Sequence, residues 1–192
     1  MSAKLSLGGS IWCYLRECTA PDTIYARFDD DICYVADDAI ANWRRCREAN
    51  VVPFLVLGNI VNNAVCSHSH QQAGLIPTSW GTVENECMDA IGWKSSVFAR
   101  RLHYQFLSDI ERGEQARWQD VAIETDGMSR FSINAISWFG RDLSELAELK
   151  IDEIDEEPFL TEEVPARLGR PNVVCSGALF GHYAYYTQRK YL

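Results

Sequence analysis

Apolar and more polar residues alternate along residues 24–28, and three consecutive aspartates follow at residues 29–31. Ile24, Ala26 and Phe28 share one side of an extended chain, which is the period of a β-strand with unequal faces. An apolar strand that ends in adjacent carboxylates is unusual, because like charges a few ångströms apart repel. The segment therefore predicts a strand whose end carries either a solvated acidic turn or a binding site.

A helix and a second strand are predicted next. Asp37 and Asp38 begin a helix that runs to Asn50, because its acidic first turn and its basic last turns both complement the helix dipole. Residues 54–57 (FLVL) are apolar throughout, as expected of a strand that is covered on both faces. The order strand, helix, strand predicts an α/β fold with a mostly parallel central sheet flanked by helices.

The remaining pattern predicts one domain over residues 1–192, without repeats or linkers. Further helices are expected at residues 5–18, 67–74, 95–110 and 143–149, and further strands at 130–138, 172–175 and 179–186.

Composition and charge narrow the class of protein. The chain has 192 residues, of which 47% are hydrophobic, and this is enough for one packed core. A net charge of −9 argues against a nucleic-acid backbone or an anionic membrane as partner. No stretch approaches eighteen apolar residues and the N-terminus lacks a signal pattern, so we expect no integral membrane segment.

The seven cysteines are odd in number and widely spaced, and no Cys-x-x-Cys occurs. This spacing fits neither a disulfide framework nor a zinc site. We interpret them as reduced, mostly buried side chains of a cytoplasmic protein.

The three aspartates are the first candidate for chemistry. Their carboxylates either splay into water or share a divalent cation, and hard oxygen ligands suit Mg²⁺ or Mn²⁺. On a strand Asp29 and Asp31 point to the same side, and Asp30 points to the other. Asp29 and Asp31 are therefore the pair expected to meet one ion.

Other candidates are weaker on sequence alone. The acidic run at residues 152–157 is typical of a solvated helix start, but a carboxylate in a cleft can act as a general base. His182 lies in an aromatic segment, where a histidine is either a core or edge residue or a ligand. His68 and His70 point to opposite sides of a helix and so do not form a metal pair there. No phosphate loop, Gly-x-Ser-x-Gly or His-Glu-x-x-His motif occurs.

Several blocks together resemble a family of glycosyltransferases, over about residues 22–189. They are residues 25–32 (YARFDDDI), 54–63 (FLVLGNIVNN), 66–68 (CSH), 131–140 (FSINAISWFG), 168–171 (LGRP) and 181–188 (GHYAYYTQ). The resemblance implies the C-terminal, catalytic part of a GT-A-type nucleotide-diphospho-sugar transferase. Because the aspartates come so early, the N-terminal part that binds the nucleotide base is expected to be missing.

The resemblance also implies roles for individual residues around a Mn²⁺ or Mg²⁺ cofactor. Asp29 and Asp31 match the metal-binding Asp-x-Asp, and His182 matches a histidine that completes the metal site. Asp29 and Asp30 are expected to bind the cofactor together with the diphosphate of the sugar donor.

Asp155 and Glu156 match, more loosely, the acidic pair that serves as base for the acceptor hydroxyl. The implied reaction transfers a sugar from a nucleotide-diphosphate donor to a glycan or another hydroxyl acceptor.

Two other functions stay open: a non-catalytic carbohydrate-binding or interaction module, and a metal-dependent phosphohydrolase built from the aspartates with His68 and His70. The sequence leaves the oligomeric state open.

Overall fold

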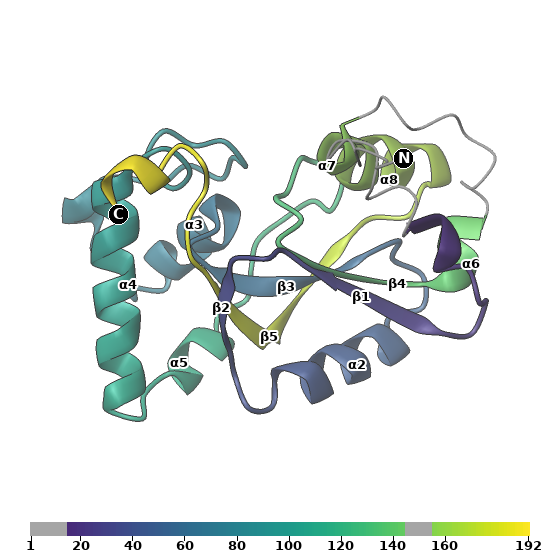
Figure 1. The fold of residues 1–192 in the computed structure, drawn as a ribbon, viewed down its shortest axis with the longest axis horizontal. Coiled ribbons are helices and arrows are strands. Elements are labelled where there is room, and N and C mark those ends of the chain that lie inside the picture. Colours follow the sequence, from purple (N-terminus) through teal and green to yellow (C-terminus); the bar gives the residue numbers. More distant parts are fainter. Residues whose placement is uncertain (1–14, 145–154) are drawn as a thin grey trace, which may run out of the picture.

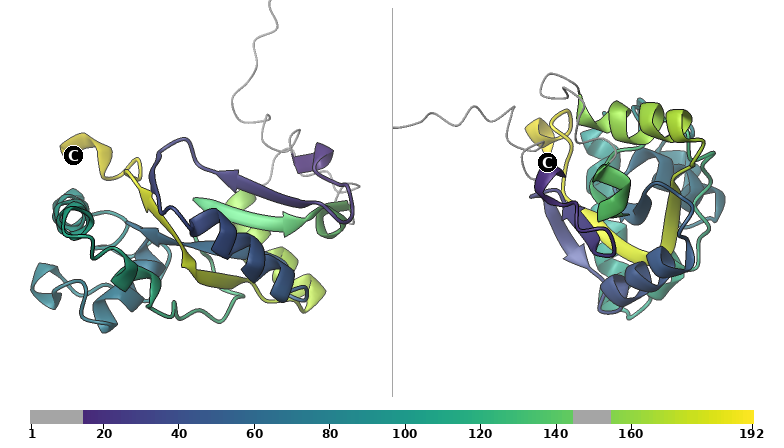
Figure 2. Two further views of the ribbon diagram at one scale, coloured as in Figure 1. Left: turned by 90° about the horizontal axis from the view of Figure 1, so that it is seen from below. Right: turned by 90° about the vertical axis from the view of Figure 1, so that its right-hand side faces the viewer.

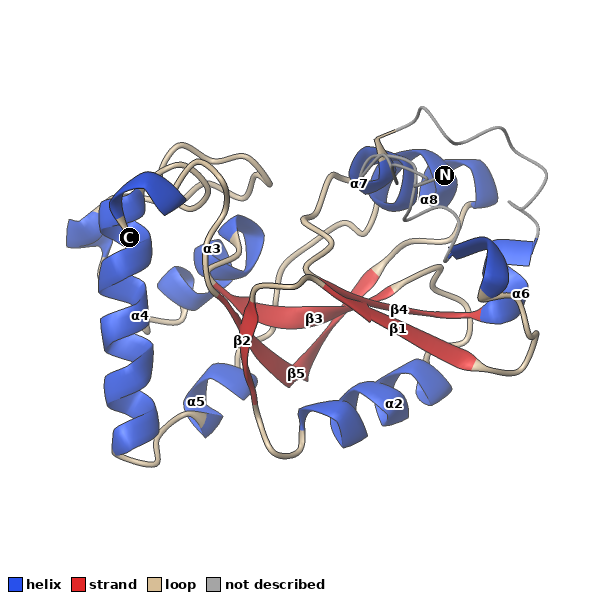
Figure 3. Cartoon of the chain, viewed as in Figure 1, coloured by secondary structure: helices blue, strands red, loops and turns tan. Residues whose placement is uncertain are grey.

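A five-stranded mixed sheet organises the protein in this computed structural model, which describes residues 15–144 and 155–192. The strand order is β1-β4-β3-β5-β2, and the arrangement can be followed in Figures 1 and 3. The strands are β1 (Ile24–Phe28), β2 (Ile32–Val35), β3 (Val56–Val61), β4 (Ala135–Phe139) and β5 (Val173–His182).

The prediction of a mostly parallel, GT-A-like sheet is wrong. Of the strand pairs in the described residues, β3–β5 is parallel, whereas β1–β4, β3–β4 and β2–β5 are antiparallel. Strands β1 and β3 do run in the same direction, as the strand–helix–strand pattern suggested, but β4 lies between them. In addition, β1 and β2 are only three residues apart, which leaves no room for the crossover that adjacent parallel strands require.

The β1–β2 turn, Asp29–Asp31, joins the two opposite edges of the sheet. Strands β1 and β2 are consecutive in the chain but stand at the two ends of the strand order. The turn is fixed on both sides, because Asp29 N–H donates to the Asn134 carbonyl (2.9 Å) and Tyr183 N–H donates to the Asp31 carbonyl (2.8 Å). The sheet thus curls so that both edges meet at the three aspartates.

Helices cover both faces and one end of this sheet. They are α2 (Ala39–Ala49), α3 (Ala64–Gln72), α4 (Ser96–Glu111), α5 (Ala116–Gln119), α6 (Gly140–Ser144), α7 (Glu156–Pro158) and α8 (Val164–Leu168), with 3₁₀ turns η1 (Thr78–Trp80) and η3 (Arg189–Tyr191) and a π turn η2 (Phe159–Glu163). Figures 1 and 2 show α2 and α8 on opposite sides of the sheet.

The expected helices at residues 37–50, 67–74 and 95–110 are confirmed as α2, α3 and α4. Two of them begin at side-chain caps, since the Asn63 oxygen accepts from Cys66 N–H (3.2 Å) and the Ser95 hydroxyl accepts from Phe98 N–H (3.2 Å). The helices expected at 5–18 and 143–149 lie mostly outside the described residues.

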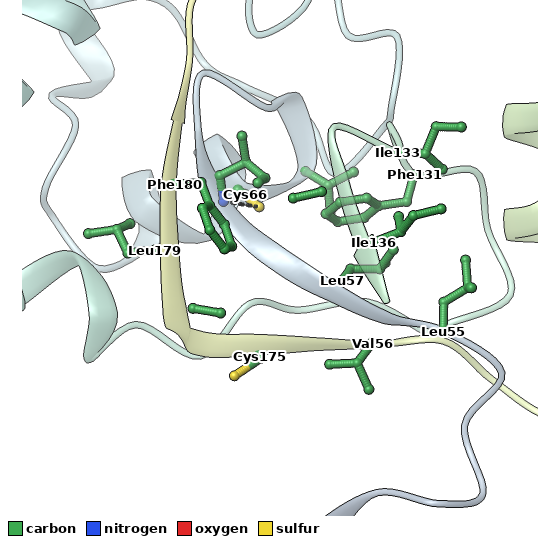
Figure 4. Packing of buried hydrophobic residues seen from close by; sticks show 14 of the residues in the cluster. Leu55, Val56, Leu57, Cys66, Phe131, Ile133, Ile136, Cys175, Leu179 and Phe180 are labelled. Atoms are coloured by element: carbon green, nitrogen blue, oxygen red, sulfur yellow. Dashed lines mark hydrogen bonds between the residues drawn. The ribbon is translucent and has the colours of Figure 1, made fainter. Parts of the chain in front are cut away.

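The core is built on the central strands. All residues of β3 and β4 are buried, and Figure 4 shows Leu57, Ile136 and Phe180 among the packed side chains. Residues 172–175 and 179–186, expected as two strands, mainly form the single strand β5, whose pairing with β3 shifts register after Gly58. A Cβ at Gly58 would lie 2.6 Å from the Phe180 ring, so only glycine fits there without movement.

Within residues 15–144 and 155–192, no helix is both long and apolar enough to span a bilayer. Of the described cysteines, Cys66, Cys87 and Cys175 are buried, while Cys33 is exposed.

Candidate metal centre and cleft

The three aspartates line an open cleft of about 480 Å³. Its other walls come from residues 130–134, from the start of α7, and from the end of β5 with the segment that follows it. In Figure 1 this region lies between α7 and the chain that leads to the C-terminus. Segments far apart in the sequence therefore meet at the β1–β2 turn.

Asp29, Asp31 and His182 form the one metal-competent group of three found among the described residues. Each offers one ligand atom, and these atoms all lie within 4.8 Å of one another. The pairing of β2 with β5 explains how distant residues meet, because Ile32, next to Asp31, is the partner of His182 across the sheet.

The His182 ring is held in one orientation. Its side chain is 2% exposed, with Nδ1 3.2 Å from the Asn62 carbonyl oxygen and Nε2 3.2 Å from Asp31 Oδ1. A carbonyl only accepts, so Nδ1 carries a hydrogen and donates it. In the neutral ring, Nε2 then presents a lone pair to a carboxylate oxygen, and two acceptors at this distance repel. A proton or a bound cation between Nε2 and Oδ1 removes this repulsion.

Asp29 is oriented by a chain of polar contacts. Arg27 Nη2 donates to Oδ1 (3.0 Å) and Asn134 Nδ2 donates to Oδ2 (3.0 Å). The amide of Asn134 is itself fixed, because its oxygen accepts from Tyr185 O–H (3.1 Å) and from Asn63 Nδ2 (3.1 Å). Burial raises the pKa of Asp29, and the nearby Arg27 guanidinium partly opposes that shift.

The described end of the second acidic run, residues 155–157, lines the same cleft, and residues 152–154 lie outside the described residues. Asp155 caps α7, and its Oδ1 accepts from Glu157 N–H (3.3 Å). Glu156 Oε1 lies 3.1 Å from Arg27 Nη2, the same nitrogen that contacts Asp29. Burial raises the pKa of Glu156, with Arg27 acting in the opposite direction. Glu157 is engaged by Arg130 Nε at 2.7 Å.

The remaining candidates, Asp30, His68 and His70, do not belong to the metal-competent group. Asp30 is exposed and lines the cleft, but it is not one of the three grouped ligands. His68 Nδ1 lies 2.8 Å from the Val83 carbonyl oxygen, and His70 Nε2 lies 2.9 Å from Asn59 Oδ1. Neither histidine lines the cleft, so the arrangement with His68 and His70 beside the aspartates is not found.

Sequence reasoning missed several cleft residues. Met88, Trp93 and Tyr186 form an aromatic and thioether wall, in which the Trp93 and Tyr186 rings meet edge to face with centroids 5.3 Å apart. The sequence pattern predicts a strand at Asn134 and gives this residue no polar role. The strand alternation offered no signal for these residues, because their positions depend on how distant segments pack.

Comparisons with known protein families, with curated proteins and with solved structures find no match for this chain. The resemblance to glycosyltransferases therefore stays a prediction from the sequence.

Proposed function

We propose that this protein is a metal-dependent glycosyltransferase that moves a sugar from a nucleotide-diphosphate donor to a hydroxyl acceptor. One observation carries the proposal: Nε2 of the buried His182 faces Asp31 Oδ1 at 3.2 Å while Nδ1 is committed to a carbonyl. Asp29 completes the group on an open cleft. The sequence resemblance supports the reaction class, and the proposal does not depend on a parallel sheet.

The donor set fits Mn²⁺ or Mg²⁺. Two carboxylates favour a hard divalent ion, and one imidazole makes Mn²⁺ the better choice of the two. The Asn62 carbonyl and the Asn134 amide fix His182 and Asp29, as supporting partners of metal ligands usually do. When bound, such an ion neutralises the charge that builds up on a departing diphosphate.

Glu156 is our candidate for the base that takes the proton of the acceptor hydroxyl. Its burial raises its pKa, which makes it a better proton acceptor than an exposed carboxylate. Arg27 holds both Glu156 and Asp29 through one nitrogen, and so fixes the base relative to the metal ligands. Asp155, with a side chain 64% exposed, is better suited to capping α7 than to catalysis.

The aromatic wall gives the cleft a surface for a ring. Tyr186 is 75% exposed and is supported by Trp93. Aromatic faces of this kind pack against the apolar face of a sugar or against a nucleobase. We assign Met88, Trp93 and Tyr186 to such contacts.

The test incubates the protein with a panel of nucleotide sugars, Mn²⁺, and an acceptor mixture of glycans and simple glycosides. Acceptor-dependent release of nucleoside diphosphate that stops when the metal is chelated supports the proposal. Metal-dependent release of nucleoside monophosphate and sugar phosphate without acceptors would instead make the protein a phosphohydrolase, because such an enzyme breaks the P–O–P link and not the bond to the sugar. Saccharide binding without turnover would make it a carbohydrate-binding module. A cytoplasmic location stays a prediction.

A further inference from the structure

Arg189 forms an ion pair with Oδ2 of Asp31, the carboxylate oxygen that does not face His182. Its Nη2 lies 2.8 Å from Asp31 Oδ2, and its Nε donates to the Ala184 carbonyl (3.2 Å). The other oxygen of Asp31 faces His182 Nε2. The carboxylate that a cation would use is therefore already partly neutralised by a guanidinium group from η3.

The described lining of the cleft carries more negative than positive charge. Among the described residues, six carboxylates line it against three guanidinium groups, namely Asp29, Asp30, Asp31, Asp155, Glu156 and Glu157 against Arg27, Arg130 and Arg189. Each of these arginines contacts at least one of these carboxylates. An anionic diphosphate would meet no uncommitted guanidinium in this arrangement, and a divalent cation changes that balance.

Of the three, Arg189 is best placed to change partners. Its side chain is 56% exposed, compared with 19% for Arg27 and 30% for Arg130. Arg27 is fixed between Asp29 and Glu156. Arg189 can therefore rotate away from Asp31 toward solvent, at the cost of a partly exposed ion pair and of the hydrogen bond from Nε to the Ala184 carbonyl.

We infer that Arg189 is an internal counter-ion that a divalent cation displaces from Asp31, and that the freed guanidinium then binds the diphosphate of the donor. This inference rests on the proposed function. A cation held by Asp29, Asp31 and His182 takes over the negative charge of Asp31 and repels the guanidinium. A diphosphate on the same cation offers Arg189 new oxygens, to which arginine binds in a charge-assisted, often bidentate manner.

The consequence is a coupling between the two ligands that depends on one side chain. In the wild type, cation and diphosphate each strengthen the binding of the other by the same factor, since such coupling is reciprocal. Without Arg189 the cation has no competitor at Asp31, whereas the diphosphate loses a partner. The two affinities should then move in opposite directions, which a general loss of structure would not produce.

The experiment is calorimetric titration of the full chain with Mn²⁺ alone, and with inorganic pyrophosphate in the absence of metal and at a fixed free Mn²⁺ concentration. The variants are Arg189→Gln, Arg189→Lys and, as a matched control, Arg44→Gln. Arg44 also forms an exposed ion pair, with Glu48 on α2 (2.9 Å), and lies outside the cleft.

For Arg189→Gln we expect Mn²⁺ to bind about twofold to tenfold more tightly, the scale of a partly exposed ion pair and its local field. Pyrophosphate in the presence of Mn²⁺ should bind about tenfold more weakly, as expected for a lost charge-assisted contact. Arg189→Lys should fall between, and Arg44→Gln should match the wild type.

The outcomes separate this inference from the proposed function. Suppose that the wild type binds Mn²⁺ but that Arg189→Gln leaves both affinities unchanged, or weakens both. The inference that Arg189 moves from Asp31 to the diphosphate is then wrong, while the proposed metal site remains supported. If the wild type binds no Mn²⁺, with or without pyrophosphate, the metal site is wrong and the inference falls with it.

Discussion

His182 and His70 are both buried, at 2% and 0% exposure, but their partners prepare them for different states. In His182 the Nδ1 hydrogen goes to a carbonyl, and Nε2 faces a carboxylate on an open cleft. In His70 the two ring nitrogens have the opposite roles, because Nε2 carries the hydrogen and donates it. The amide of Asn59 donates to two carbonyls, those of Trp118 (2.8 Å) and Ser176 (3.1 Å), so its oxygen accepts from Nε2–H of His70.

The second nitrogen decides what each ring can do. Nδ1 of His70 is buried without a hydrogen-bond partner in the described part of the chain, and the ring packs edge-on against Trp118. Burial lowers the pKa of His70 to about 3, so this ring stays neutral and structural. Burial alone therefore does not mark a functional histidine. A carboxylate opposite the free nitrogen, with access to a cleft, distinguishes His182.

The largest expected effect on activity comes from removing the two carboxylates that are grouped with His182, those of Asp29 and Asp31. The double substitution Asp29→Asn, Asp31→Asn should reduce sugar transfer by about a thousandfold or more. Without the two carboxylates the divalent cation is not held, and its positive charge no longer stabilises the departing diphosphate. Steady-state turnover with saturating Mn²⁺ measures it. Asp37→Asn, at an exposed position outside the cleft, is the control. Substantial activity in the double variant would rule out the metal site.

The next effect concerns the base beside the metal ligands. Glu156→Gln should lower turnover by about two to four orders of magnitude, the usual scale for a general base, while Mn²⁺ binding survives. A base works when deprotonated, and burial raises the pKa of Glu156. Turnover of the wild type should therefore fall with decreasing pH, at a higher pH than an exposed glutamate would give.

The pH–rate profile of Glu156→Gln should lack that acid limb. Glu48→Gln on α2 serves as the control, since Glu48 lies outside the cleft. If Glu156→Gln and Asp155→Asn both retain full turnover, neither residue belongs to the mechanism.

A smaller effect tests the His70 side. Its pKa of about 3 lies below the value of about 6.5 in an unfolded chain, so acid favours the unfolded state, which takes up the proton first. The stabilising contribution is complete above pH 6.5 and is lost as the pH falls toward 3. Between pH 7 and pH 5 this linkage should remove about 2 kcal/mol of unfolding free energy.

Urea unfolding of wild type and His70→Gln across this range measures the loss. The variant should be less stable at pH 7 but should lose less stability on acidification. Parallel pH profiles for the two proteins would show that His70 does not set this dependence.

Local pattern was enough for part of this fold. The strand at β1 and the helices α2 and α4 follow from alternation, dipole and periodicity within one segment. The sheet could not be predicted, because the insertion of β4 between β1 and β3 depends on contacts across about a hundred residues of sequence. The sequence pattern does not predict strand β2, because this strand is short and directly follows three aspartates.

In the site, too, local pattern predicts some residues, while the positions of others depend on long-range packing. Strand alternation placed Asp29 and Asp31 on one side, although β1 in fact ends at Phe28 and the turn brings them together. His182 was reached through the resemblance, and the β2–β5 pairing supplies the physical reason. Asn134 and Tyr185, which orient Asp29, carry no local signal because their roles arise only from packing.

The central claim is that His182 and the two aspartates bind a divalent cation, and calorimetric titration with Mn²⁺ tests it most directly. It compares wild type, His182→Gln and His70→Gln, each with and without inorganic pyrophosphate. We predict one Mn²⁺ per wild-type chain, binding weakened by about tenfold to a hundredfold in His182→Gln, and wild-type affinity in His70→Gln. Equal Mn²⁺ binding by His182→Gln and wild type, or none by the wild type, would contradict the account.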